Sequence, residues 1–150
     1  MQLDPEGHFS DYVGLEHLPR RHMWMSGSGD SSHVKSMKSE FHRGDILFGK
    51  LRPYFHKVVS ASVDGICSTD IFVMRAKDPK MQGFALAALS SDETISRCGA
   101  FGAGTRMPRV SWKDLANCPI RWPGNGAGKS FSEKVMAVRD RVDAAYAESR

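Results

Sequence analysis

The sequence predicts an α+β fold, with short strands in the first half of the chain and helices in the second. Short β-branched and aromatic stretches separated by turn residues come first, and Ala- and Leu-rich or capped stretches follow from Pro79 onward. At 150 residues the chain has the length of one domain with its own core. We expect a globule over residues 1–123, followed by a Gly linker and the start of a C-terminal helix over 124–150.

Turn and strand residues define the expected β elements. Gly49 interrupts an apolar stretch, which favours a bulge or a close backbone approach. The region around Trp24 is rich in Gly and Ser and predicts an exposed loop. Strands are expected over 11–18, 45–51, 56–63 and 66–76, the last two joined as a hairpin at Asp64-Gly65, and loops over 21–34 and 99–110.

Helical patterns dominate the second half. Pro79 suits the first turn of a helix, and Ser91 or Asp92 can cap the next one. Ser130 and Glu133 have the spacing of a capping box. Helices are therefore expected over 79–91, 91–101 and 130–149, with a helical turn and a short strand in 111–123. The last helix carries an apolar stripe, formed by Val135, Val138, Val142 and Tyr146, that faces either its own core or a partner helix.

Positive charge is concentrated in two separated segments. The net charge is only +4, but residues 35–57 hold six Lys or Arg against two acids, and residues 97–121 hold five against one. If the fold brings these segments together, they form a patch that attracts a polyanion. If it does not, they are ordinary solvated surfaces.

Motifs for chemistry are weak. GNGAGKS (124–130) resembles a phosphate loop, but the first glycine of that motif falls on Pro123. The six histidines and three cysteines lack the spacing of a metal site, so no metal, cofactor or catalytic residue is expected. The odd number of cysteines favours a reducing cytoplasm, and no apolar run is long enough to span a membrane.

Four blocks carry a resemblance to a known family. They are YVGLEHL (12–18), F-x-x-GDILFGKLRPYFHKV (41–58), DGICSTDIFVMR (64–75) and MPRVSWKDLANCPIRWP (107–123). In order and spacing they resemble the target recognition domain of type I restriction-modification specificity subunits. The resemblance implies a mainly β, partly β-helix-like globule followed by a spacer-type helix. It also implies sequence-specific binding of double-stranded DNA without catalysis, alongside methyltransferase and restriction subunits, and self-association through the helix.

The resemblance and the charge pattern together suggest roles for individual residues. Phosphate contacts are expected from Lys50, Arg52, Tyr54 and Lys57, with Lys50 and Arg52 on one strand face and Tyr54 continuing it. The alternative is that Lys50 and Arg52 pair with an acid such as Asp70. Base reading is expected from Arg106, Arg109, Trp24 and His22, whereas Phe48, Phe55, Phe72 and Trp112 are expected in the core.

Two other functions remain open at this point. One is a phosphate- or nucleotide-binding enzyme built on GNGAGKS (124–130). The other is a single-stranded nucleic-acid binder that uses the cations and aromatic rings of residues 50–57.

Overall fold

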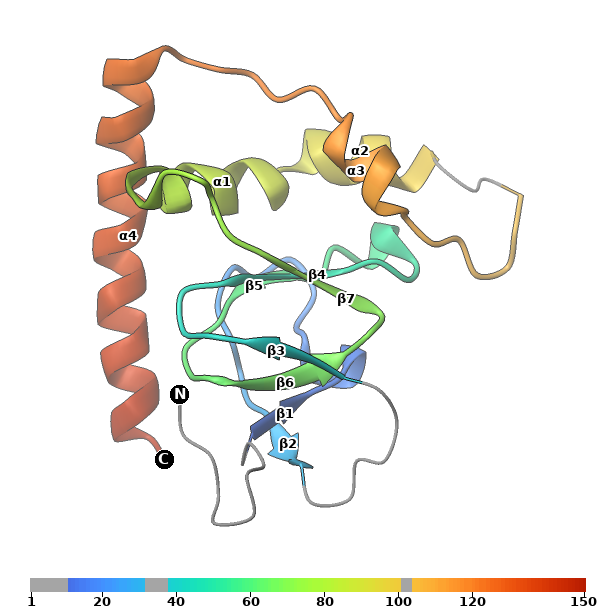
Figure 1. Cartoon of the computed structure of the whole chain (residues 1–150), viewed down its shortest axis with the longest axis horizontal. Helices are drawn as coiled ribbons and strands as arrows, with labels where there is room; N and C mark the ends of the chain where they lie inside the picture. The colour runs from blue at the N-terminus through green and yellow to red at the C-terminus, as the bar shows by residue number, and fades with distance from the viewer. Residues whose placement is uncertain (1–10, 32–37, 101–103) are drawn as a thin grey trace.

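The structure, a computed structural model, describes residues 11–31, 38–100 and 104–150 (Figure 1). Its strands form a four-stranded sheet of order β2-β1-β6-β3 and a three-stranded sheet of order β5-β4-β7. The strands are β1 (Asp11–Val13), β2 (Gly29–Asp30), β3 (Lys38–Phe41), β4 (Ile46–Gly49), β5 (Val58–Ser60), β6 (Gly65–Ser68) and β7 (Ile71–Met74).

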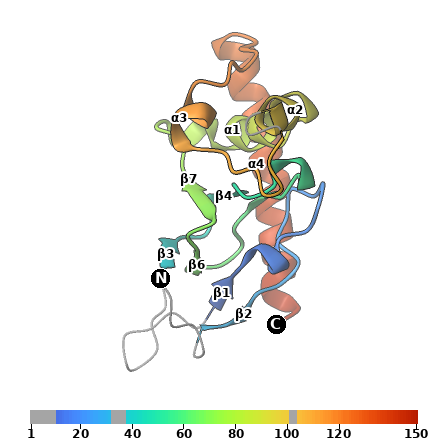
Figure 2. The same cartoon turned by 90° about the vertical axis from the view of Figure 1, so that its right-hand side faces the viewer.

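Helices follow the strands and cover one of the two sheets. Helices α1 (Gln82–Leu89), α2 (Asp92–Ala100) and α3 (Trp112–Ala116) lie over the three-stranded sheet, away from the four-stranded one (Figures 1 and 2). Helix α4 (Asn125–Glu148) runs along the side of both layers. Short 3-10 helices are η1 (Leu15–His17), η3 (Pro53–Phe55) and η4 (Pro79–Met81). The α+β class predicted from the sequence is confirmed.

Strand β4 is the centre of the core. Its residues alternate between two apolar clusters, because successive side chains of a strand point to opposite faces. Ile46 and Phe48 pack with α1, α2 and α3 residues, whereas Leu47 packs with Phe41 and Cys67 of the other sheet. All four residues of β4 are buried. This double burial explains why the stretch reads as a continuous apolar run in the sequence.

The expected hairpin of 56–63 with 66–76 is wrong. Strand β5 pairs with β4 instead, and β6 pairs in parallel with β1 and antiparallel with β3, in the other sheet. The chain thus changes sheets at Asp64-Gly65. Both valines of β5 are fully buried, so tertiary pairing with β4 outweighs the local turn signal. Strand β3 and the short strand β2 were also not predicted from the sequence.

One helix end follows the predicted capping, and a second cap was not predicted. The Ser91 hydroxyl accepts the backbone N–H of Thr94 at 3.2 Å, as expected, and the Ser111 side chain accepts that of Asp114 at 3.1 Å. The short strand expected after α3 is absent from residues 117–123, which have no regular structure. The loop expected over 99–110 is only partly described, because residues 101–103 lie outside the described residues.

Helix α4 begins at Asn125, so the predicted linker and the capping box at Ser130 and Glu133 are wrong. Close packing explains the early start. A Cβ at Gly128 would lie 3.0 Å from the Trp122 ring, and one at Gly83 of α1 would lie 2.3 Å from the Ser132 carbonyl oxygen. Glycine at both sites lets the backbones approach. A boundary between two parts at residue 123 stays a prediction.

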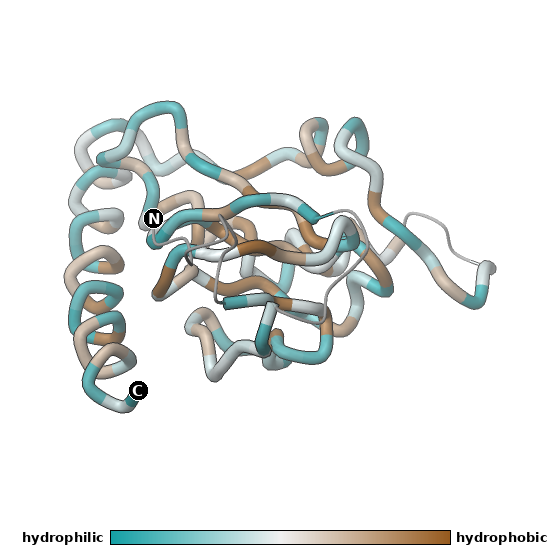
Figure 3. The backbone as a smooth tube through the Cα atoms, turned by 60° about the horizontal axis from the view of Figure 1, so that its bottom comes forward, coloured by the Kyte–Doolittle hydropathy of each residue, from teal (hydrophilic) through white to brown (hydrophobic). Residues whose placement is uncertain are grey.

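The far end of α4 is tied to the β layers. Ser62 donates a hydrogen bond to the Asp143 carboxylate at 2.8 Å, and Arg150 pairs with Asp11 of β1. Hydrophobic and hydrophilic residues alternate along the helix (Figure 3). Within the part of the chain that the structure describes, no helix combines the length and the apolar character that a membrane span needs.

Candidate nucleic-acid interface

The two basic segments meet just beyond the end of β4. Leu51 and Arg109 form an isolated antiparallel bridge. The backbone N–H of Arg52 donates to the Pro108 carbonyl at 2.7 Å, and that of Val110 donates to the Lys50 carbonyl at 2.9 Å. Residues 50–52 and 108–110 therefore run side by side, which is the condition under which the charge pattern forms one patch.

The backbone turns sharply at Arg52. This residue has the left-handed conformation, with φ +51° and ψ +64°, and Pro53 then starts η3. The expected alternation of Lys50, Arg52 and Tyr54 along one strand face is therefore wrong, because the strand ends at Gly49. A left-handed non-glycine residue costs on the order of 1 kcal/mol. The hydrogen bonds on both sides of Arg52 hold it there.

Aromatic rings support three of the cations. The Lys50 ammonium lies 4.5 Å from the Phe72 ring centre, and the Arg20 guanidinium lies 3.9 Å from the Phe55 ring centre. Arg52 lies over the same Phe55 ring at 5.9 Å. Such contacts orient a cation without neutralising it. We call Arg20, Lys50, Arg52, Arg106 and Arg109 the basic strip.

Asp70 is the acid that pairs with the basic strip. It accepts a hydrogen bond from Arg109, whose side chain remains 51% exposed. The alternative pairing of Asp70 with Lys50 or Arg52 is therefore not the one observed. The Arg52 Nε atom is buried and has no hydrogen-bond partner among the described residues.

The side chains of Lys57 and Trp24 contact other parts of the fold. The Lys57 ammonium donates to the Leu15 carbonyl at 2.7 Å. Partial burial lowers the pKa of Lys57, and the nearby Arg20 charge lowers it further. Trp24 bridges to Ser60 and packs against the cluster beneath the helices. Their predicted contacts with DNA stay predictions, and both side chains have other partners here.

The remaining predicted contact residues are exposed. His22 and Arg106 lie at the surface, and Tyr54 is 52% exposed. Trp112, which was expected in the core, is 58% exposed and packs edge-on against Phe72 with ring centres 5.6 Å apart. Phe48 is fully buried, as expected.

Sequence reasoning missed Arg20. The segment before residue 35 is acidic overall, and this balance concealed the adjacent arginines 20 and 21. The Arg21 side chain points toward the helices instead, and its guanidinium contacts Asp92 of α2 at 3.1 Å. The signal that singles out Arg20 is structural, since Phe55 is 35 residues away in the sequence.

The apolar stripe of α4 is divided between two faces. Val135 packs against the cluster that contains Leu86, and Tyr146 packs against the cluster formed by residues of both sheets. Val138 is 49% exposed, and Val142 is partly buried. For Val135 and Tyr146 the structure supplies partners within the chain. A partner-helix role for Val138 and Val142 stays a prediction.

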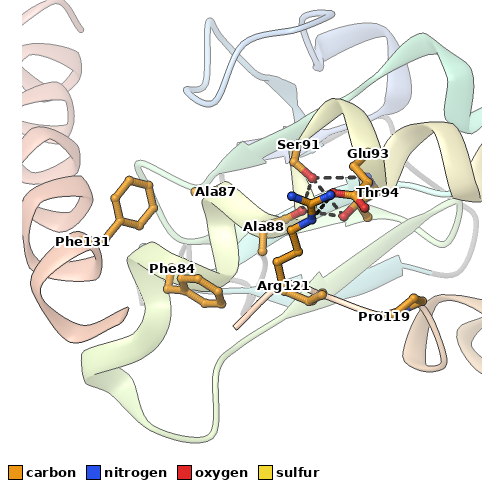
Figure 4. Close-up of a pocket in the computed structure, with 10 residues that line it drawn as sticks. Phe84, Ala87, Ala88, Ser91, Glu93, Thr94, Pro119, Arg121 and Phe131 are labelled. Atoms are coloured by element: carbon orange, nitrogen blue, oxygen red, sulfur yellow. Dashed lines mark hydrogen bonds and ion pairs between the residues drawn. The ribbon is translucent and has the colours of Figure 1, made fainter. Parts of the chain in front are cut away.

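A shallow groove of about 240 Å³ lies between α1, α2 and residues 119–121 (Figure 4). Its hydroxyl groups serve the helix ends, because Ser91 donates to the Ala88 carbonyl at 2.8 Å and Thr94 donates to the same carbonyl at 2.7 Å. Arg121 reaches Glu93 at 3.4 Å. The groove offers no arrangement of a nucleophile and a base.

The phosphate-loop alternative has no structural support. Residues 125–130 form the first turns of α4 rather than a loop, whereas the motif needs a loop whose backbone N–H groups surround the phosphates. In the described ranges, no three His, Cys, Asp or Glu side chains gather as metal ligands would.

Known proteins resemble this chain in both sequence and fold. No protein-family model matches it. The EcoDI type I restriction enzyme specificity subunit of Escherichia coli is 30% identical over 121 residues, which cover 75% of this chain and 27% of that subunit. The chain thus spans about a quarter of the length of that relative.

Solved structures agree on the fold. The HsdS subunit of Thermoanaerobacter tengcongensis matches with a TM-score of 0.62 and 25% identity, over 91% of this chain and 37% of that one. A chain of a type I R-M system matches with a TM-score of 0.67 and 23% identity, over 92% of this chain and 37% of that one. The chain is therefore related to type I restriction specificity subunits and has the fold of part of an HsdS subunit.

Proposed function

We propose that this chain recognises a specific sequence of double-stranded DNA as the recognition module of a type I restriction-modification specificity subunit. Three residues of the basic strip, Arg20, Lys50 and Arg52, bind the phosphates. Arg106, Arg109 and His22 then approach base edges from the adjoining loops. Phosphate contacts supply affinity and base contacts supply sequence choice.

The observation that carries the proposal is the pairing of Leu51 with Arg109. Segments more than fifty residues apart meet there and form one cationic surface. Among the described residues, only one ion pair involves the basic strip, the pair of Arg109 with Asp70. Neither basic segment forms such a cationic surface alone. The relationship to specificity subunits supports reading the surface as a contact for duplex DNA.

The proposal assigns no catalytic step to this chain. Methylation and restriction would be performed by partner subunits, directed to the site that this chain selects. Self-association would use the exposed part of α4 around Val138, which is 49% exposed. The proposed location is the cytoplasm, and the three unpaired cysteines fit a reducing compartment.

Selection of bound duplexes from a random library tests this function. The full chain, together with its methyltransferase partner, is expected to enrich one defined sequence. Single-stranded competitor should displace the duplex poorly. Equal enrichment of all sequences would contradict the recognition role, and a preference for single strands would favour the other nucleic-acid hypothesis.

A further inference from the structure

A second cationic surface lies at the other end of β4. A cleft of about 540 Å³ opens between the turn before β4, the segment after β7, and α4. This volume lies in the range of ligand-binding pockets, roughly 300–1,000 Å³. The residues that define this cationic cleft are Arg43, Arg75, Lys77, Gln82, Met136 and Arg139.

One glutamine holds two walls of the cleft together. The Gln82 side-chain amide donates to the Gly44 carbonyl at 2.7 Å, and its oxygen accepts the backbone N–H of Ala76 at 2.7 Å. Gln82 is 8% exposed. The turn and the segment after β7 are thus fixed relative to each other before any ligand arrives, which lowers the entropy cost of binding.

The acid of the cleft is already engaged. Asp45 is 2% exposed, and its carboxylate accepts hydrogen bonds from Arg75 at 2.6 and 2.7 Å and from the backbone N–H of His42 at 2.8 Å. Arg75 nevertheless remains 62% exposed. Its outer face therefore stays open to a further anion.

The other cations face the same space with little compensation. Arg139 pairs with the exposed Asp140 at 3.1 Å, and one of its terminal nitrogens lies 3.7 Å from where a Cβ of Gly44 would be. The side chains of Arg43 and Lys77 are exposed and pair with no carboxylate of the described residues. Four cations against two acids, Asp45 and Asp140, that are already paired make the cleft a site for carboxylates.

The floor of the cleft indicates what kind of anion fits. Met136, Pro79 and Ala76 give it an apolar base between the cations. A methionine surface adapts to different side chains. A duplex presents mainly charged phosphates on its outside, whereas a peptide that combines acidic and aliphatic residues can place an aliphatic side chain on such a floor and its carboxylates beside the cations.

We propose that the cationic cleft binds an acidic peptide segment of a protein partner. Glutamate or aspartate carboxylates pair with Arg43, Arg75, Lys77 and Arg139, and one aliphatic side chain rests on Met136. The cleft is separated from the basic strip by the length of β4, so a partner held here leaves the strip exposed for DNA. This inference does not depend on the proposed DNA sequence specificity.

A short labelled peptide in which glutamates flank one leucine tests the proposal by fluorescence anisotropy with the full chain. A peptide with glutamine in place of each glutamate is the matched probe. Only the acidic peptide is expected to bind, with amide shifts in a nitrogen-15 spectrum centred on Ala76 and Lys77. Equal binding of the two peptides, or no binding of either, would overturn the proposal.

Paired variants locate the binding. Arg43→Gln combined with Lys77→Gln should weaken the acidic peptide by roughly tenfold, about threefold for each exposed ion pair. Lys129→Gln combined with Lys134→Gln removes the same charge from exposed positions of α4 and should change affinity less than twofold. Equal loss in both double variants would contradict the proposal. A loss of duplex affinity in the Arg43 and Lys77 variant, with peptide affinity unchanged, would assign the cleft to DNA instead.

Discussion

The two ends of β4 carry positive charge in different ways. At the end beyond Gly49, Arg20, Lys50 and Arg52 lie over aromatic rings, with Arg20 exposed and the other two side chains half-buried. At the end before Ile46, Arg75 and Arg139 are paired with carboxylates around a concave cleft. The ends are only roughly 10 Å apart along the strand. Shape and neighbouring groups, rather than the number of cations, therefore distinguish a surface for duplex DNA from a site for a peptide.

The largest effect on stability is expected from a substitution that forces α4 away from α1. Gly83→Ala places a Cβ where the Ser132 carbonyl oxygen lies at 2.3 Å, so α1 and α4 must move apart. We expect the free energy of unfolding in urea to fall by about 1–3 kcal/mol. Peptide binding at the cleft should weaken with it, because Arg139 lies on α4, whereas duplex affinity at 25 °C should persist.

Gly126→Ala is the matched control for this variant. Apart from the neighbouring backbone of α4, no atom of the described residues lies within 4 Å of a Cβ at Gly126. Alanine favours the helix by roughly 0.5–1 kcal/mol relative to glycine. This variant should be as stable as the parent protein or slightly more so. Equal destabilisation by the two substitutions would show that the contact between α1 and α4 is not close.

Arg106 tests the base-reading part of the DNA surface. Its exposed side chain follows Gly104, whose φ of +97° suits glycine. Arg106→Ala should reduce discrimination at one base pair of the target by about 1–3 kcal/mol and leave random-sequence affinity nearly unchanged. Titration against all single-base variants of the selected target measures this, and a uniform loss across the variants would assign Arg106 to a phosphate.

Arg52 tests the phosphate-binding part. Arg52→Ala and Arg52→Gly both remove the charge, but glycine accepts the left-handed backbone without strain. Both variants should weaken specific and random duplexes alike, by about 1 kcal/mol, and lower the salt dependence by about one unit. Recovery of affinity by Arg52→Gly alone would show that the backbone shape, and not the charge, is what DNA binding requires.

Substitution of Asp70 is expected to have the smallest effect on duplex affinity, and to raise this affinity rather than lower it. Asp70 pairs with Arg109, and in the proposed complex its carboxylate competes with the base edges for that side chain. Asp70→Asn should therefore strengthen duplex binding by about twofold to fivefold, the value of an exposed ion pair. Asp140→Asn, which releases Arg139 in the cleft at the other end of β4, should leave duplex affinity unchanged. Weaker binding by the Asp70 variant would show that the ion pair positions Arg109 for its contact.

Local signals predicted much of this fold correctly. Strand β4, the helical start at Pro79 and the cap at Ser91 all follow from nearby residues. The choice of strand partners did not, because β5 and β6 separate into different sheets. The start of α4 was also missed, since close contacts of Gly128 with Trp122 and Met81 make a glycine-rich segment helical.

The candidate site shows the same difference between local signals and contacts that join distant segments. The sequence singled out Lys50, Arg52 and Arg106 from charge and from the family resemblance, and their contacts with DNA stay predictions. It did not reveal that Lys57 donates to the Leu15 carbonyl or that Arg20 lies over Phe55, because both contacts join distant segments. Trp112 was misplaced for a related reason: an aromatic residue at the start of a short helix gives no sign of which side faces solvent.

The salt dependence of duplex affinity tests the central claim most directly. One triple variant replaces Arg20, Lys50 and Arg52 by glutamine, and its control replaces Arg43, Lys77 and Lys134, so that both lose the same charge. The slope of log affinity against log salt should fall by roughly 3 in the first variant and stay at the parent value in the second. Equal slopes for the two variants would contradict the claim that the strip beyond β4 is where DNA binds.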